Sequence, residues 1–292
     1  MRITFYGSSH GIPETGRKCS STMITVGSGD DAARFFIDMG TQSMEKMKNL
    51  GIHPDTVRSI FITHMHGDHT FGLPSFIDLS DWFFKNYSTK IFLPRESAKT
   101  AICQWILENW VGTNGWIEEL NADISSYKSG EIFNDGIIKV NATKNFHIDD
   151  SYSFLIEHDG KRIIYTGDLR NPGIDFPIEF SDEKVDLLIC EGAHFPLCDY
   201  SDIVNKLPIK EILVTHYTEK CAAEFDEFKK QIKVMKVWHS STAVRVLAYY
   251  GESDTPEYKN MRRYIKENMF AYLRTPYVGA KKKIGMLLTY FT

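Results

Sequence analysis

Residues 61–70 read FITHMHGDHT and place three histidines and one aspartate within six positions. The chain has 292 residues and only ten histidines, so this concentration is its most distinctive local feature. Neutral imidazoles together with a carboxylate are ligands that zinc, iron and manganese take in proteins. The stretch therefore predicts a metal site that includes His64, His66, Asp68 and His69.

The residues around this motif predict a strand that turns into a helix. SIFIT is an apolar run typical of a buried strand, so His64 and His66, two positions apart in extended chain, point to the same side. Gly67 permits a sharp turn, and Asp68 suits the N-cap of the next helix, which places His69 in its first turn. The four side chains thus converge at the carboxyl end of one strand.

Strand-like runs and helical segments alternate along the rest of the chain. RITFYG, STMITVG and RFFIDMG precede the motif, and GIIKVNATKNF, SYSFLIEHDGKRIIYTGD, VDLLICEG and EILVTH follow from about residue 130. Two helices are expected soon after the motif, and a third from about Glu219 to Lys233. The expected apolar stripes of the first two are Phe76, Ile77, Leu79, Trp82 and Phe83, then Ala101, Ile102, Trp105, Ile106 and Trp110.

This alternation predicts an α/β (α+β) chain folded as a four-layer αββα sandwich, with two mixed β-sheets flanked by helices. With 42% hydrophobic residues the chain can bury a sizeable core. We expect one domain over residues 1–250. Residues 251–292 read as a helix and a closing strand that pack on the same domain or on a second copy, which makes a homodimer plausible.

Composition restricts the function classes. The net charge of −4 provides no overall basic field to hold nucleic acid. No run approaches the roughly 20 apolar residues of a membrane span, and the N-terminus has no signal-peptide core. The five scattered cysteines include no CxxC pair, which favours reduced thiols and a cytoplasmic protein.

FITHMHGDHTFGLP, residues 61–74, resembles the signature HxHxDHxxGLP of the metallo-β-lactamase-fold hydrolases, in particular the tRNA 3′-processing endonucleases (RNase Z) and related phosphodiesterases. GSSHGIPETGRKCSST is similar to the glycine-rich opening of that branch, and FIDMG to its strand-end Asp-x-Gly. The resemblance covers roughly residues 1–220. It implies the metallo-β-lactamase fold and places Asp38 beneath the site, where its carboxylate would orient a ligand histidine through a hydrogen bond.

The resemblance also implies three ligands at the ends of later strands, which are His147, Asp168 and His216. Asp168 would bridge two divalent ions, which we expect to be zinc, with manganese or iron as alternatives. The implied ligand sets are His64, His66 and His147 for one ion and Asp68, His69 and His216 for the other.

ICEGAHF, residues 189–195, resembles the place where the tRNA-processing enzymes carry His-Glu-Ala-Thr, a segment tied to protonation of the leaving group. Here Cys190 stands at the histidine, and Glu191 keeps the glutamate position. We expect His194 to act as general acid or oxyanion donor, with Glu191 holding it.

Two bound cations would lower the pKa of a bridging water, so that hydroxide exists near neutral pH, and would neutralise charge in the transition state. Asp68 would hold the hydroxide in line. No GK[ST] motif occurs in the chain, and because the nucleophile is water this chemistry needs no serine or cysteine nucleophile. The sequence thus predicts a metal-dependent hydrolase. His10, in the glycine-rich loop, and His239, after a later strand, are further histidines that could face the site.

The resemblance points to a phosphodiester substrate. In the tRNA-processing family a long arm that grips tRNA commonly emerges between the third histidine motif and the bridging aspartate. Here only the twenty residues 148–167 separate His147 from Asp168, and they read as a tight hairpin around an Asp-Gly turn. Without that arm, and with a negative net charge, a small or short phosphodiester is favoured over tRNA. The alternatives are tRNA 3′ processing, hydrolysis of an ester, thioester or lactam, and a non-catalytic metal-dependent binding or sensor protein.

Overall fold

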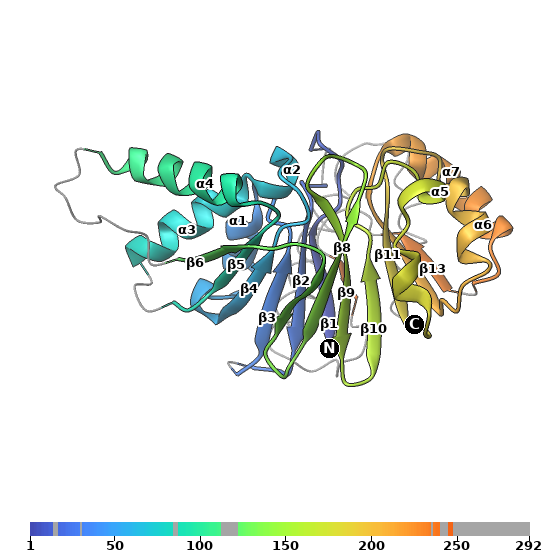
Figure 1. The fold of residues 1–292 in the computed structure, drawn as a ribbon, viewed down its shortest axis with the longest axis horizontal. Helices are drawn as coiled ribbons and strands as arrows, with labels where there is room; N and C mark the ends of the chain where they lie inside the picture. The colour runs from blue at the N-terminus through green and yellow to red at the C-terminus, as the bar shows by residue number, and fades with distance from the viewer. Residues whose placement is uncertain are drawn as a thin grey trace, which may run out of the picture.

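The computed structural model describes residues 1–13, 17–29, 31–83, 87–111, 122–234, 236–239 and 245–247. Over these residues two seven-stranded β-sheets face each other, and helices cover the outer face of each (Figure 1). The expected sandwich of two mixed sheets flanked by helices is confirmed. Residues 251–292, where a closing helix and strand were expected, lie outside the described residues.

The first sheet has the order β14-β1-β2-β3-β4-β5-β6. Its first strands are antiparallel, and from β3 onward the neighbours are parallel. Its strands are β1 (Arg2–Gly7), β2 (Ser21–Val26), β3 (Ala33–Ile37), β4 (Val57–Phe61), β5 (Lys90–Leu93), β6 (Asp123–Ser126) and β14 (Arg245–Leu247).

The second sheet repeats this plan in the order β13-β12-β11-β10-β9-β8-β7. The strands from β7 to β10 are antiparallel, and those from β10 to β13 are parallel. Its strands are β7 (Gly130–Asn134), β8 (Lys139–Asn145), β9 (Ser151–His158), β10 (Lys161–Tyr165), β11 (Leu187–Gly192), β12 (Glu211–Tyr217) and β13 (Lys236–His239). The Asp-Gly hairpin predicted between β9 and β10 is confirmed by the pairing of His158 with Lys161.

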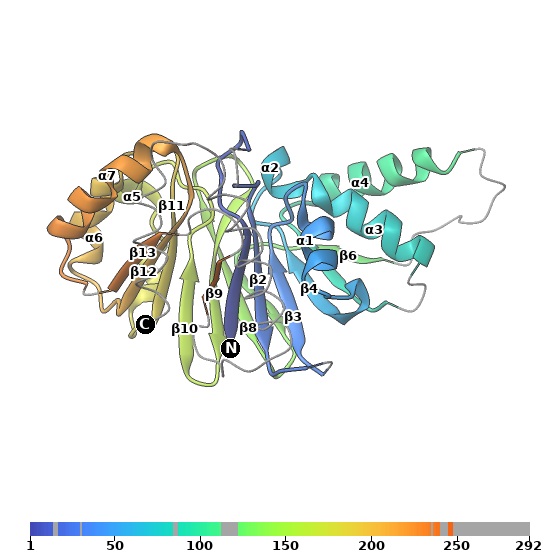
Figure 2. The same cartoon turned by 180° about the vertical axis from the view of Figure 1, so that it is seen from behind.

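The helices form the two outer layers (Figure 2). α1 (Ser43–Asn49), α3 (Gly72–Phe83) and α4 (Glu96–Asn109) cover the first sheet, whereas α5 (Pro172–Asp175), α6 (Ser201–Val204) and α7 (Glu219–Gln231) cover the second. One apolar cluster fills the space between the sheets, and a further cluster lies under each helical layer. None of the helices in the described part of the chain combines the length and apolar character that a membrane crossing needs. The five cysteines, all described, form no disulfide.

The apolar stripes expected for the two long helices were drawn too wide. In α3, Phe76 and Ile77 are fully buried, but Phe83 is 72% exposed. In α4, Ile102 and Ile106 are buried four positions apart, and Trp105 is 59% exposed. Because a helix that packs on one sheet buries a single narrow face, the aromatic side chains on its flank remain at the surface.

Candidate metal centre

The histidine–aspartate motif His64–His69 lies directly after β4, at the carboxyl edge of the first sheet. α2 (Gly67–Thr70) begins two residues earlier than expected, so His66 is its N-cap, and Asp68 lies in the first turn instead of capping it. A Cβ atom at Gly67 would lie 2.3 Å from the exposed ring of Phe71, so a side chain at this position would require that ring to move aside. The turn brings the rings of His64 and His66 to a centroid separation of 4.6 Å.

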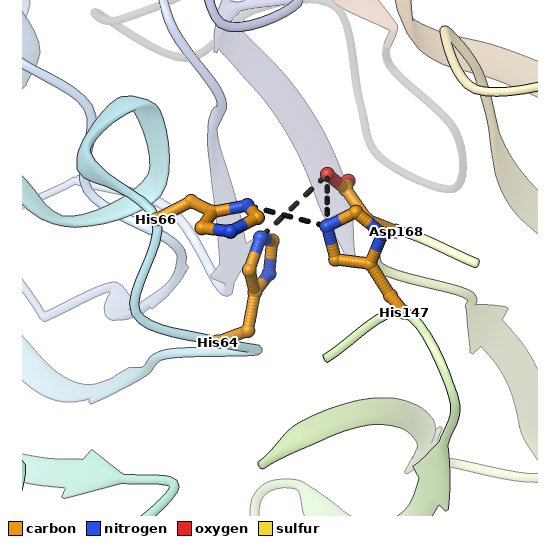
Figure 3. Close-up of side chains that lie close together, drawn as sticks. All are labelled: His64, His66, His147 and Asp168. Carbon is orange, nitrogen blue, oxygen red and sulfur yellow. Dashed lines mark hydrogen bonds and ion pairs between the residues drawn. The ribbon is translucent and has the colours of Figure 1, made fainter. Parts of the chain in front are cut away.

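One group of ligand atoms combines both sheets (Figure 3). His64 and His66 come from the first sheet, and His147, after β8, and Asp168, after β10, come from the second. One ligand atom from each lies within 4.8 Å of all the others. The His147 Nε2 atom lies 3.2 Å from His66 Nδ1 and 3.7 Å from Asp168 Oδ2.

A second group lies beside the first and consists of Asp68, His69 and His216, again with ligand atoms within 4.8 Å of one another. His216 belongs to β12, next to the strand end that carries the glycine-rich loop. Asp168 Oδ2 lies 3.4 Å from His69 Nε2 and 3.3 Å from His216 Nε2. Asp168 therefore stands between the two groups.

Asp38 lies beneath this site. The carboxylate is fully buried, and Oδ2 lies 2.7 Å from His69 Nδ1. Oδ1 accepts hydrogen bonds from the amide and hydroxyl of Thr63 at 2.8 and 2.9 Å. Asp38 has a φ of 57°, a conformation that non-glycine residues rarely adopt and that tends to persist only where surrounding contacts enforce it. These contacts direct His69 Nε2 toward Asp68 and Asp168.

The residues fit a divalent metal ion. His64 Nε2 and His69 Nε2 are buried and have no hydrogen-bond partner, although buried polar atoms are normally paired. Burial lowers the pKa of His64 well below its usual value and lowers that of His147 to about 4, against the opposing charge of Asp168. Neutral imidazole is the form that binds metals. Burial alone would also lower the pKa of His69, but the nearby carboxylates of Asp168 and Asp38 raise it well above its usual value.

His194 borders the same site and is held by Glu191. Glu191 is buried at the end of β11, and Oε2 lies 2.8 Å from His194 Nδ1 and accepts the Ala193 amide at 2.9 Å. The ring nitrogen of His194 lies 3.9 Å from Asp168 Oδ2. Burial lowers the pKa of His194, but the hydrogen bond and charge of Glu191 outweigh burial and raise it to about 9. The imidazole therefore carries a proton at neutral pH.

Neither His10 nor His239, the two further histidines named from the sequence, belongs to the ligand groups described above. Gly11, the residue after His10 in the glycine-rich loop, lies next to the site: a Cβ atom there would be 3.8 Å from Asp68 Oδ2. His10 Nδ1 lies 3.5 Å from the amide of Ile12. His239 ends β13, and its side chain lies outside the described part of the chain.

Sequence reasoning missed the support of His216. Arg17 Nη1 donates to the carbonyl of Tyr217 at 2.7 Å, and the guanidinium lies 4.2 Å from the centre of the Tyr217 ring. The Tyr217 amide donates to the Ser8 carbonyl at 3.2 Å. This clamp holds the strand end where His216 has a φ of 46°, with its Nδ1 atom buried and without a hydrogen-bond partner. The signal that the sequence offered for this contact was Arg17 itself, a charged residue inside the glycine-rich loop.

The two sheets and the histidine–aspartate cluster between their edges define a protein with the metallo-β-lactamase fold, the fold of metal-dependent hydrolases. The metallo-β-lactamase fold protein YhfI from Bacillus subtilis superposes with a TM-score of 0.65 at 18% identity, covering 84% of this chain and 99% of YhfI. The short form of human tRNase Z superposes with a TM-score of 0.58 at 18% identity, covering 85% of this chain and 98% of that enzyme. A diphosphatase of the PhnP family superposes with a TM-score of 0.60 at 16% identity, covering 85% of this chain and 97% of the diphosphatase.

The particular family follows from the sequence profile described as Anti-Pycsar protein Apyc1, which matches residues 1–238. The chain belongs to this family. It is also similar to Ribonuclease BN of Citrobacter koseri, with 26% identity over 234 residues that cover 76% of this chain and 72% of that enzyme. Against Ribonuclease BN of Salmonella paratyphi B the identity is 27% over 178 residues, and the chain spans 55% of that relative's length.

Proposed function

We propose that this chain is a metal-dependent phosphodiesterase that acts on a small or short phosphodiester. The observation that carries the proposal is the position of Asp168, because its Oδ2 atom lies 3.3–3.7 Å from one ring nitrogen of each of four histidines. These histidines, drawn from both ligand groups, are His64, His69, His147 and His216. A carboxylate shared in this way suits a pair of divalent ions, which we expect to be zinc, with manganese or iron as alternatives.

When bound, such ions supply charge neutralisation at the phosphate and acidify water. Asp68, held by the first turn of α2, would orient the attacking water. His194 Nδ1 is engaged by Glu191, so His194 Nε2 is the atom that would donate a proton to the leaving oxygen. Asp38 keeps His69 in place through its buried hydrogen bond.

Two observations support a small or short substrate. Residues 148–167, which are all described, form a tight hairpin between His147 and Asp168, so no long arm for tRNA projects from this part of the chain. The net charge of −4 also disfavours binding of a large polyanion. The second candidate is an RNase-type activity such as tRNA 3′ processing, which the likeness to Ribonuclease BN and to human tRNase Z favours.

The test is a side-by-side assay of the metal-loaded protein on bis-p-nitrophenyl phosphate, a p-nitrophenyl carboxylate ester, a thioester, a lactam and precursor tRNA. We expect hydrolysis of the phosphodiester that a chelator abolishes. His64→Ala should lose both bound metal and on the order of 100-fold in rate, since loss even of a residue that only orients a metal ligand typically costs about 10- to 100-fold. His53→Ala is the matched control. His53 is an exposed histidine that pairs with Asp55 before the start of β4, whereas the metal site follows the end of that strand.

Each outcome of this assay decides between functions. Turnover of only the carbon esters or the lactam would refute the phosphodiesterase proposal. Cleavage of precursor tRNA without cleavage of the small diester would favour the RNase-type candidate. Metal binding without turnover of any substrate would indicate a binding or sensor protein, and an unchanged rate in His64→Ala would separate turnover from this site.

A further inference from the structure

His147 differs from two other histidines of the site in what holds its ring. The Nδ1 atoms of His69 and His194 each contact a buried carboxylate. Among the described contacts none involves His147 Nδ1, and its Nε2 atom faces His66 and Asp168 (Figure 3). The position of the His147 ring therefore depends on the main chain that carries it.

Sheet pairing alone does not link His147 to Asp168. His147 follows β8 and Asp168 follows β10, and β9 lies between these two strands in the sheet. Because neighbouring strands are about 4.8 Å apart, the two strand ends are separated by roughly 10 Å. Residues 146 and 169–171 lie beyond the strand ends, so their amides need partners outside the sheet.

The carboxylate of Asp175 supplies this link. Asp175 is the last residue of the four-residue helix α5, and its side chain is buried. Its Oδ2 atom accepts hydrogen bonds from the amide of Phe146, in the loop after β8, and from the amide of Arg170, in the loop after β10, both at 2.9 Å. Its Oδ1 atom accepts the amide of Asn171 at 3.1 Å. One buried carboxylate thus joins the two loops.

The loop after Asp168 is held by carboxylates over three consecutive amides. The Leu169 amide donates to Glu191 Oε1 at 2.7 Å, and the amides of residues 170–171 donate to Asp175. Hydrogen bonds to an ionised carboxylate are roughly twice as strong as those between neutral groups. The main chain that carries Asp168 is therefore fixed directly after the ligand.

Asn145 forms a second link between the same two loops. Its side chain is fully buried, and it accepts the amide of His147 and donates to the carbonyl of Thr166, each at 3.3 Å. These hydrogen bonds are longer than those of Asp175 and involve no charge. The larger share of the linkage therefore belongs to Asp175.

We propose that Asp175 is a positioning residue of the metal centre and sets the distance between His147 and Asp168. It acts on the ligand group drawn in Figure 3, which contains both residues, more than on the second group, which shares only Asp168. This inference rests on the metal centre of the proposed function and adds to it a residue that lies outside both ligand groups.

Asp175→Asn tests the proposal in a zinc titration of the full chain against a chromophoric chelator. The amide keeps the size of the side chain, but it removes the charge and replaces one acceptor by a donor. We expect the ion of the Figure 3 group to bind roughly 10- to 100-fold more weakly, as for other residues that orient metal ligands. The other ion should bind nearly as it does in the unmodified protein.

Nuclear magnetic resonance shows which ion is affected. In cadmium-loaded protein with nitrogen-labelled histidine, coupling between cadmium and a ring nitrogen identifies each ligand. At cadmium concentrations that saturate the unmodified protein, Asp175→Asn should lose the coupling of His147 and keep those of His69 and His216. Loss of binding at both ions alike, or at neither, would overturn the inference.

The matched control is Asp186→Asn. Asp186 is also a buried aspartate of the second sheet and accepts the amide of Arg162 at 3.3 Å, but it precedes β11, at the edge opposite to the metal centre. Both variants should lose stability in urea unfolding of the metal-free protein. Only Asp175→Asn should weaken zinc binding, whereas a merely structural role for Asp175 would make the two variants alike.

Asp175→Glu decides the question if the asparagine variant does not fold. It retains the charge, but the longer side chain displaces the carboxylate from the three amides. The ion of the Figure 3 group should again bind more weakly than in the unmodified protein. Unchanged binding of both ions in this variant would overturn the proposal.

The titrations separate this inference from the function on which it rests. Protein that cleaves bis-p-nitrophenyl phosphate but binds both ions unchanged in Asp175→Asn contradicts the positioning role alone. Protein in which Asp175→Asn weakens one ion selectively but which cleaves no diester contradicts the proposed function instead.

Discussion

At the scale of single residues, the histidines of the site are held in different ways. His69 contacts a buried carboxylate, Asp38, and His194 contacts another, Glu191. His216 has no such partner on Nδ1, and its position depends on a left-handed backbone that Arg17 clamps through Tyr217. These two arrangements can be tested separately, because a carboxylate holds the ring nitrogen of His69, whereas Arg17 holds the main chain next to His216.

Asp38→Asn tests the first arrangement. The amide keeps the shape of the side chain but weakens the charge-assisted contact with His69, so we expect metal affinity to fall roughly 10- to 100-fold. Competition with a chromophoric chelator measures this affinity. Asp55→Asn, which alters an exposed aspartate–histidine pair at the surface, is the control and should leave the affinity unchanged. Equal affinities in the two variants would refute an orienting role for Asp38.

Arg17→Met tests the second arrangement. Its loss leaves the Tyr217 carbonyl without this donor, which costs on the order of 1–3 kcal/mol of stability, and releases the strand end that carries His216. We expect a metal titration to show one of two ions bound more weakly, while the other is retained. Arg17→Lys should restore part of the affinity, since lysine can donate but does not stack in the same way.

The control for Arg17 is Arg34→Met. Arg34 is also buried and donates to two backbone carbonyls, those of Ala32 and Gly29, but these lie in the turn between β2 and β3. Both variants should lose stability in chemical denaturation, and only Arg17→Met should change the metal titration. A purely structural role for Arg17 would make the two variants alike.

At the scale of elements, the hairpin between β9 and β10 brings Asp168 back to the site only twenty-one positions after His147. Its turn residues Asp159 and Gly160 have φ values of 48° and 67°, which match a two-residue turn with left-handed backbone at both positions. The two-residue turn keeps the connection between β9 and β10 short, whereas a longer insertion at this point would project from the sheet. The register of β9 with β10, and hence the position of Asp168, depends on it.

Gly160→Ala should lower the free energy of unfolding by about 1–2 kcal/mol, because a Cβ in left-handed backbone is strained. A Cβ at this position would meet no atom within 4 Å, so the effect is conformational and not a clash. Asp159→Gly is the companion variant, and we expect a smaller change, since relief of strain opposes the greater freedom of the unfolded chain. Urea unfolding of both variants measures the difference, and equal effects would contradict this account of the turn.

At the scale of the whole molecule, the metal centre lies where the two sheets meet. His64, His66, Asp68 and His69 follow a strand of the first sheet, whereas His147, Asp168 and His216 belong to the second. An ion bound by ligands from both sheets connects the two halves of the sandwich. Metal binding should therefore stabilise the whole fold and not only the site.

Removal of metal with a chelator should lower the melting temperature by on the order of 5 °C when metal was present at about 100 times its dissociation constant. Differential scanning calorimetry with and without chelator measures this shift. His64→Ala should show little metal-dependent shift, and His53→Ala should keep it. A shift of the same size in His64→Ala would mean that the stabilising ion binds elsewhere.

The sequence alone determined the strand–turn–helix that carries the first four ligands, because those residues lie within six positions and local geometry places them together. It also predicted most strands of the sandwich, since alternating apolar runs report burial. The short strands β6 and β7 and the helix α1 were missed because they are short and half polar. His147, Asp168 and His216 could be named only through a family resemblance.

Only the tertiary structure decided that those three side chains meet the first four and that Arg17 supports His216. The physical reason is that sheet order and register bring together residues 200 or more positions apart, such as Arg17 and Tyr217. Local hydrophobic patterns specify which residues are buried, but they do not specify which distant strand lies next to them.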